Sequence, residues 1–238
     1  MKIYTEKINK NVSVVKEIFF TEHCNCYIVE DEKDIIIIDF GVGGIKFSSI
    51  IDNFNDKNIL SILTHFHFDH LLGIEQFETI YCSNLEPLDF GLKYLHSNDF
   101  EDKSFYMNKL ASITSTSIKS LLETIKKKYL FEKDSIITSN FNFEIIQTPG
   151  HDSTSISLYE KNRKWLFCGD LLYDGELLVD LEDSDINDYI NSLNKIKNLD
   201  VEYLFPGHNQ VIKGEDIIQL LSNKIKYLKN HYKNNLEK

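Results

Sequence analysis

The sequence predicts a layered α/β protein in which helices cover the outer faces of two β-sheets. Two observations lead to this fold class. Runs of β-branched and aromatic residues, separated by charged turns, fill the first third of the 238-residue chain and return after residue 134. Segments with apolar residues at helical spacing alternate with these groups of strands. The order of strands, helix, insertion, strands and helices therefore favours two sheets over a helical bundle.

The first part of the chain predicts strands and one short helix. The run Ile35-Ile36-Ile37-Ile38 is the strongest apolar block, and it is far too short to span a bilayer, so no membrane partner is expected. Strands are expected at residues 12–20, 24–30, 34–39, 58–64 and 79–83, with a short helix at 71–77.

The middle of the chain, about residues 85–134, predicts a helical insertion or cap. Apolar residues at helical spacing indicate a helix over residues 116–130. Its aromatic residues and Met107 could line an apolar acyl pocket or only form the insertion's own small core: Phe90, Tyr94, Phe100, Phe105 and Tyr106.

The last part of the chain predicts strands at 135–148, 155–160 and 164–168, followed by two helices. Ser184 or Asp185 is expected to cap the first helix, because such side chains accept hydrogen bonds from free N–H groups. The final helix, from about Glu215, begins with acidic residues and ends with lysines, as the helix dipole favours. We therefore expect one domain over residues 1–238, carrying the insertion at about 85–134.

Composition and charge exclude several classes of protein. The 26 Lys and Arg against 37 Asp and Glu give a net charge of −11, which argues against nucleic-acid partners. No export signal is visible behind Met1, and the four cysteines show no C-x-x-C spacing, so reduced thiols and a cytoplasmic location are expected. The sequence leaves a homodimer open.

A dense group of metal-binding residue types follows the strand expected at 58–64. It is the hexapeptide His65-Phe66-His67-Phe68-Asp69-His70, and imidazole nitrogens and carboxylate oxygens are ligands that zinc accepts. On an extended backbone His65 and His67 point the same way, because side chains alternate with period two. They could bind one ion while Asp69 and His70 bind a second.

Further candidate ligands stand at the ends of later strands. Two of the three prolines occur in the same tripeptide, Pro149-Gly150-His151 and Pro206-Gly207-His208, which marks a sharp turn after a strand. Asp170 follows an apolar strand that ends in glycine. With His151 on the first ion, His208 on the second and Asp170 bridging them, the set completes a site for two metal ions.

These motifs resemble the metallo-β-lactamase superfamily. The matching segments, in order, are Asp39-Phe40-Gly41, Thr64 to His70, Thr148 to His151, Phe167 to Asp170 and Phe205 to His208. The resemblance implies an αββα sandwich with the metal ions at one edge between the sheets. It also implies that Asp39 supports a ligand histidine from outside the ligand set.

Within that superfamily the sequence favours hydrolysis of a small thioester or ester, as in the glyoxalase II and acyl-CoA thioesterase-like branch. The expected cofactors are two divalent metal ions, zinc or alternatively iron or manganese, with a bridging hydroxide as nucleophile. Asp69, Asp170 and Tyr173 are the predicted catalytic residues, and Tyr173 stands where related lactonases carry a tyrosine that contacts the substrate oxyanion. The alternatives are a lactonase, a mononuclear-iron persulfide dioxygenase, and a metal-bearing binding protein with little turnover.

Overall fold

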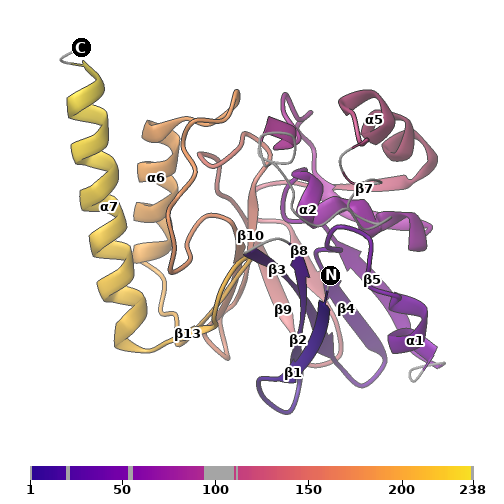
Figure 1. Cartoon of the computed structure of the whole chain (residues 1–238). Coiled ribbons are helices and arrows are strands. Elements are labelled where there is room, and N and C mark those ends of the chain that lie inside the picture. Colours follow the sequence, from indigo (N-terminus) through magenta and orange to yellow (C-terminus); the bar gives the residue numbers. More distant parts are fainter. Residues whose placement is uncertain (1, 20–21, 53–55, 94–109, 111, 237–238) are drawn as a thin grey trace.

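Two β-sheets pack face to face in the computed structural model, and helices cover their outer faces (Figure 1). The structure describes residues 2–19, 22–52, 56–93, 110 and 112–236. In spatial order the first sheet contains β1 (Lys2–Lys7), β2 (Val12–Phe19), β3 (Glu22–Glu30), β4 (Asp34–Ile38), β5 (Asn58–Ile62), β6 (Thr79–Ser83) and β7 (Lys126–Leu130). The second sheet contains β13 (Ile212–Lys213), β12 (Tyr203–Pro206), β11 (Trp165–Gly169), β10 (Ile156–Glu160), β9 (Asn142–Gln147) and β8 (Ser135–Ile137).

The helices lie outside this pair of sheets. On the first sheet they are α1 (Phe47–Ile51), α2 (Phe68–Leu71), the 3-10 helix η2 (Leu72–Gln76) and α5 (Ser115–Thr124). On the second sheet they are α6 (Ile186–Lys197) and α7 (Glu215–Leu236). Asp185 caps α6 as predicted, since its carboxylate accepts a hydrogen bond from the Asp188 N–H.

The isoleucine run of β4 explains why the layers stack in this order. Ile35 and Ile37 face the helices of the first sheet, whereas Ile36 and Ile38 face the second sheet. All four are at most 1% exposed, and burying a side chain of this kind contributes about 1.5–3 kcal/mol. A strand that is apolar on both faces is stable only between two layers, which gives the predicted αββα architecture.

The helix predicted over residues 116–130 is wrong beyond Thr124. The chain becomes extended at Ile125, and Lys126–Leu130 pairs with β6 in parallel as the edge strand β7. The strand predicted at 135–148 is a hairpin of β8 and β9. Strands β1 and β13 were not predicted from the sequence.

The predicted acyl pocket of the insertion is described in the structure at one of its residues only. Of the residues proposed for an acyl pocket, Phe90 is buried in the core beside α2. Tyr94, Phe100, Phe105, Tyr106 and Met107 lie outside the described residues.

Within the described part of the chain, no helix has the length and apolar content needed to cross a membrane.

Candidate metal centre

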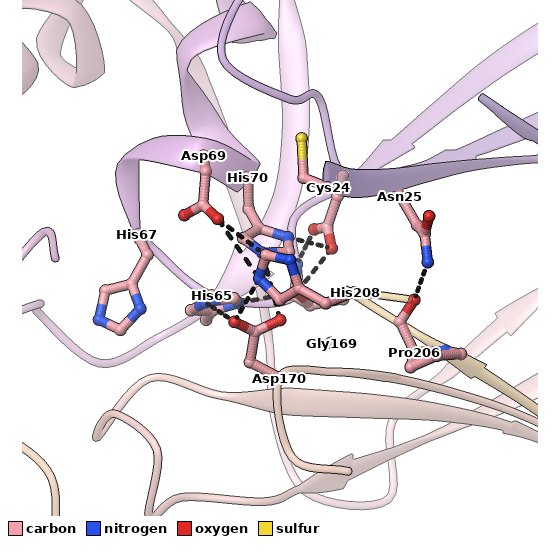
Figure 2. Close-up of polar contacts among 12 residues, drawn as sticks. Cys24, Asn25, His65, His67, Asp69, His70, Gly169, Asp170, Pro206 and His208 are labelled. Carbon is pink, nitrogen blue, oxygen red and sulfur yellow. Dashed lines mark hydrogen bonds and ion pairs between the residues drawn. The ribbon is translucent and has the colours of Figure 1, made fainter. Parts of the chain in front are cut away.

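All seven predicted ligands lie at the same edge of the sandwich, where strands of both sheets end. Figure 2 shows six of them: His65, His67, Asp69, His70, Asp170 and His208. His65 to His70 follow β5 of the first sheet. His151, Asp170 and His208 follow β9, β11 and β12 of the second sheet. None of the seven is more than 8% exposed, so the cluster is buried between the two sheets.

One group of possible ligands consists of His65, His67 and His151, with one ligand atom from each lying within 4.8 Å of the others. Nε2 of His151 lies 2.9 Å from Nδ1 of His67. The ring centroids of His65 and His151 are 5.2 Å apart. The three imidazoles therefore converge from both sheets, as predicted for the first ion.

A second group consists of Asp69, His70 and His208, which meet the same distance limit. Oδ2 of Asp69 lies 3.4 Å from Nε2 of His208 and 3.6 Å from Nε2 of His70. Asp69 and His70 lie on α2, because the chain turns into a helix at Phe68. This turn allows neighbouring residues to face the same centre.

Asp170 reaches both groups. Its Oδ2 atom lies 3.4 Å from Nε2 of His151 and 3.0 Å from Nε2 of His208. Its Oδ1 atom lies 3.2 Å from Nε2 of His70. The carboxylate thus stands between the two groups, where a shared ligand would have to lie.

The residues present fit divalent metal ions. Nε2 of His65 and Nε2 of His67 are buried without a hydrogen-bond partner among the described residues. Burying such atoms unpaired is costly, and ligation by a metal ion is one of the ways in which proteins offset that cost. Imidazole nitrogens and carboxylates form the donor set of zinc sites that keep a position open for water or substrate.

Asp39 and Thr64 hold two of the candidate ligand histidines in orientation. The Asp39 carboxylate accepts hydrogen bonds from the backbone N–H and the hydroxyl of Thr64, both at 2.8 Å. Oδ2 of Asp39 also lies 2.9 Å from Nδ1 of His70, and the Thr64 hydroxyl lies 3.0 Å from Nδ1 of His65. Both histidines therefore direct Nε2 toward the centre.

Strand β3 of the first sheet holds the turn that carries His208. Nδ2 of Asn25 donates to the carbonyls of Pro206 and Asn209, at 2.9 and 3.0 Å. The Asn25 backbone N–H donates to the carbonyl of Gly207 at 2.7 Å (the Asn25–Pro206 contact is drawn in Figure 2). Nδ1 of His208 bonds the carbonyl of His23 at 2.8 Å. Neither His23 nor Asn25 was predicted to belong to the site, since neither stands in a recognisable motif.

Asp152 organises the loop after His151. It is fully buried and accepts hydrogen bonds from the hydroxyls of Thr154 and Ser155. The Ser184 hydroxyl donates to the carbonyl of His151 at 2.6 Å. In the sequence, this loop is marked by Thr154 and Ser155, two hydroxyl residues that closely follow Asp152.

The two Pro-Gly-His turns give their histidines different proton affinities. Burial and the nearby His67 lower the pKa of His151 to about 4. Burial also disfavours the charged form of His208, but Asp170 and Asp69 outweigh it and raise the pKa of His208 to about 9. In the metal-free protein His151 is therefore a neutral ligand at pH 7, whereas His208 is protonated.

Tyr173 lies beside this centre with its hydroxyl engaged. The hydroxyl donates to the carbonyl of Glu176 at 2.6 Å, and the ring centroid lies 5.4 Å from that of His208. A phenol has one proton to donate, so contact with a substrate oxyanion requires release from Glu176.

Two sheets with outer helices and a His/Asp cluster at one edge define an αββα protein with a site able to hold metal ions. The sequence profile of the metallo-beta-lactamase superfamily matches residues 20–81 and 91–208. The chain belongs to this superfamily.

The chain is similar to curated hydrolases over most of its length. Acyl-coenzyme A thioesterase MBLAC2 of Bos taurus is 26% identical over 220 residues, which cover 84% of this chain and 78% of that protein. Hydroxyacylglutathione hydrolase GloC of Haemophilus influenzae is 25% identical over 166 residues, covering 69% and 73%. A solved metallo-beta-lactamase from Pontibacter korlensis superposes with a TM-score of 0.71 over 96% of this chain and all of that chain, at 17% identity, which shows the fold.

Proposed function

We propose that the protein is a metal-dependent hydrolase that cleaves a small thioester or ester. The observation that carries the proposal is Asp170, whose carboxylate lies within 3.4 Å of one histidine from each group. The similarity to an acyl-coenzyme A thioesterase and to a hydroxyacylglutathione hydrolase supports a thioester as substrate.

In this proposal the two groups bind one divalent ion each. His65, His67 and His151 would hold the first ion, Asp69, His70 and His208 would hold the second, and Asp170 is placed to serve as a ligand shared by the two groups. When bound, such a pair of ions supplies a hydroxide nucleophile at neutral pH and polarises the substrate carbonyl.

The protein's own groups orient the reaction and move the proton. Asp39 and Thr64 fix the rings of His65 and His70, so that these ligands do not have to reorganise during turnover. The Asp69 carboxylate, 8% exposed, would take the proton released by the attacking nucleophile and pass it to the leaving thiolate or alkoxide.

Metal analysis together with a substrate panel tests the proposal. The panel contains an acyl-CoA, S-lactoylglutathione, a lactone and a cephalosporin. We expect two ions per chain and turnover of one thioester well above the others. Fewer than one ion per chain would contradict the two-ion site, and two ions without turnover of any substrate would favour a binding protein.

Asp170→Ala should lower kcat/KM by about 100-fold or more and reduce the metal content, because the carboxylate shared by both groups is lost. Asp200→Ala is the matched control, since Asp200 lies on the surface with its side chain 74% exposed. Full activity of Asp170→Ala would remove this residue from the site.

A further inference from the structure

Each sheet ends in two edge strands, and these edges differ in their protection against pairing with another chain. An unpaired strand edge exposes backbone N–H and C=O groups, and proteins commonly shield it with lysines or keep it short. In the second sheet the edges β8 and β13 have three and two residues. In the first sheet β7 begins with Lys126-Lys127-Lys128.

Strand β1 is longer than β8 and β13 and lacks a block of lysines like that of β7, because its two lysines stand only at its ends. It is six residues long, all of its residues are exposed, and both Ile3 and Tyr4 are more than 40% exposed. Its charges are mixed, with Lys2 and Lys7 against Glu6. We propose that β1 pairs antiparallel with β1 of a second copy of this chain, which makes the protein a two-fold symmetric dimer.

The pairing with β2 shows which backbone groups of β1 are directed outward. The N–H of Ile8 donates to the carbonyl of Val12, and β1 pairs with β2 in the same register. Hydrogen-bonded and non-hydrogen-bonded pairs alternate in an antiparallel ladder. The even-numbered residues of β1 therefore bond to β2, while Ile3, Thr5 and Lys7 direct their N–H and C=O groups to the free edge.

Charge complementarity selects one register. When Tyr4 faces Tyr4 of the other copy across the two-fold axis, Ile3 faces Thr5 and these two exchange backbone hydrogen bonds. The same register places Lys2 opposite Glu6 of the other copy on both sides of the axis, where Glu6, which accepts from Lys16 of its own chain at 3.0 Å, would gain a second cation. Lys2–Glu6 and Tyr4–Tyr4 are then non-hydrogen-bonded pairs, in which facing side chains lie closest.

The neighbouring register loses this complementarity. Moving the strands by one pair places Thr5 opposite Thr5, Tyr4 opposite Glu6 and Ile3 opposite Lys7, without an ion pair. A closed two-fold interface also satisfies both free edges at once and leaves no edge for further addition, because β7 carries lysines.

A charge swap tests the dimer by light scattering during gel filtration. The unmodified protein should elute with twice the 27.8 kDa mass of the chain. Lys2→Glu and Glu6→Lys should each raise the dissociation constant about tenfold or more, because two attractive pairs become repulsive. The double variant should restore the dimer, and Lys126→Glu on β7 should change nothing.

Disulfide trapping tests the register. Tyr4→Cys should form a cross-linked dimer on oxidation, since the residue meets its own copy on the axis, whereas Ile3→Cys should not. The four native cysteines are buried and free of disulfides, so they do not compete. A monomeric unmodified protein, a dimer indifferent to both single charge variants, or cross-linking by Ile3→Cys in place of Tyr4→Cys would overturn the proposal.

Discussion

Pro149-Gly150-His151 and Pro206-Gly207-His208 are the same tripeptide, but different parts of the molecule hold them. The first turn is fixed within its own layer, where Ser192 of α6 donates to the carbonyl of Pro149 and the Asp185 N–H donates to the carbonyl of Gly150. The second turn is fixed across the sandwich by Asn25 and His23 of the opposite sheet. The position of one histidine therefore depends on helix packing, and that of the other on how the sheets meet.

The two glycines have correspondingly different reasons to lack a side chain. Gly150 has a φ angle of +137°, and a Cβ atom there would overlap the backbone of Tyr189 in α6. In Gly207 a Cβ atom would overlap the carboxylate of Asp170 and the ring of His70. The first glycine thus serves the packing of the fold, and the second serves the cluster of ligands.

The largest effects are expected from alanine at these two glycines. Gly150→Ala should lower the free energy of unfolding by about 3 kcal/mol or more, because strain and backbone overlap add. Gly207→Ala should lower the metal content by more than half with a smaller loss of stability. Urea unfolding of the metal-free proteins and metal analysis separate the two outcomes. An equal loss of stability in both variants would erase the distinction between the turns.

Removing one hydrogen-bonding side chain behind each turn gives the next largest effect. Asn25→Ala leaves the carbonyls of Pro206 and Asn209 without this partner and should cost about 1–3 kcal/mol, together with weaker metal binding. Ser192→Ala, which frees the carbonyl of Pro149, should cost about 1 kcal/mol and leave the binding of the second ion unchanged. The metal dissociation constants of both variants, measured beside their urea midpoints, decide whether the sheet junction holds His208.

The pKa values predict opposite responses of the two histidines to pH in the metal-free protein. Because the pKa of His208 is raised to about 9, its stabilising contribution is complete below pH 6.5 and is lost as pH rises through 9. Because the pKa of His151 is lowered to about 4, stability falls as pH drops below 6.5. His151→Gln should reduce the acid slope of the unfolding free energy, and the remaining slope is due to His65 and His67, whose pKa values burial also lowers. His208→Gln should reduce the alkaline slope, and the remaining slope is due to His70, whose pKa Asp170 and Asp69 raise.

Metal binding should show the same contrast in its proton balance. An ion bound by Asp69, His70 and His208 must displace the proton of His208, so its affinity should rise about tenfold per pH unit for each proton displaced below pH 9. The group that contains His151 should release no proton from this residue at pH 7. Calorimetric titrations in two buffers of different ionisation enthalpy count the protons, and equal release from both groups would contradict the contrast.

The smallest effect is expected at Tyr173, whose ring contacts His208 but whose proton is donated to Glu176. Tyr173→Phe keeps the ring and removes the hydroxyl, so kcat should fall by about tenfold or less with the metal retained. A larger fall in kcat without a change in KM would show that the hydroxyl leaves Glu176 for the substrate oxyanion.

The convergence of the seven candidate residues could be predicted from the sequence, because each of them follows the end of a strand. Pro-Gly ends the strands before His151 and His208, and glycine ends the strand before Asp170. Asn25 was missed because its partners lie about 180 residues away, so no local pattern records the contact. Strand β7 was taken for helix because the apolar spacing of α5 continues into it, whereas its pairing with β6 is a long-range contact.

The ligands come from both sheets, His65 to His70 from one and His151, Asp170 and His208 from the other. This division has a consequence for assembly of the protein. Neither sheet on its own carries either complete group, since His151 and His208 each complete a group begun by the first sheet. The two groups of candidate ligands are therefore expected to come together only after the two halves of the chain have docked. A metal ion bound there would link the two halves late in folding. It would stabilise both halves against unfolding as one unit.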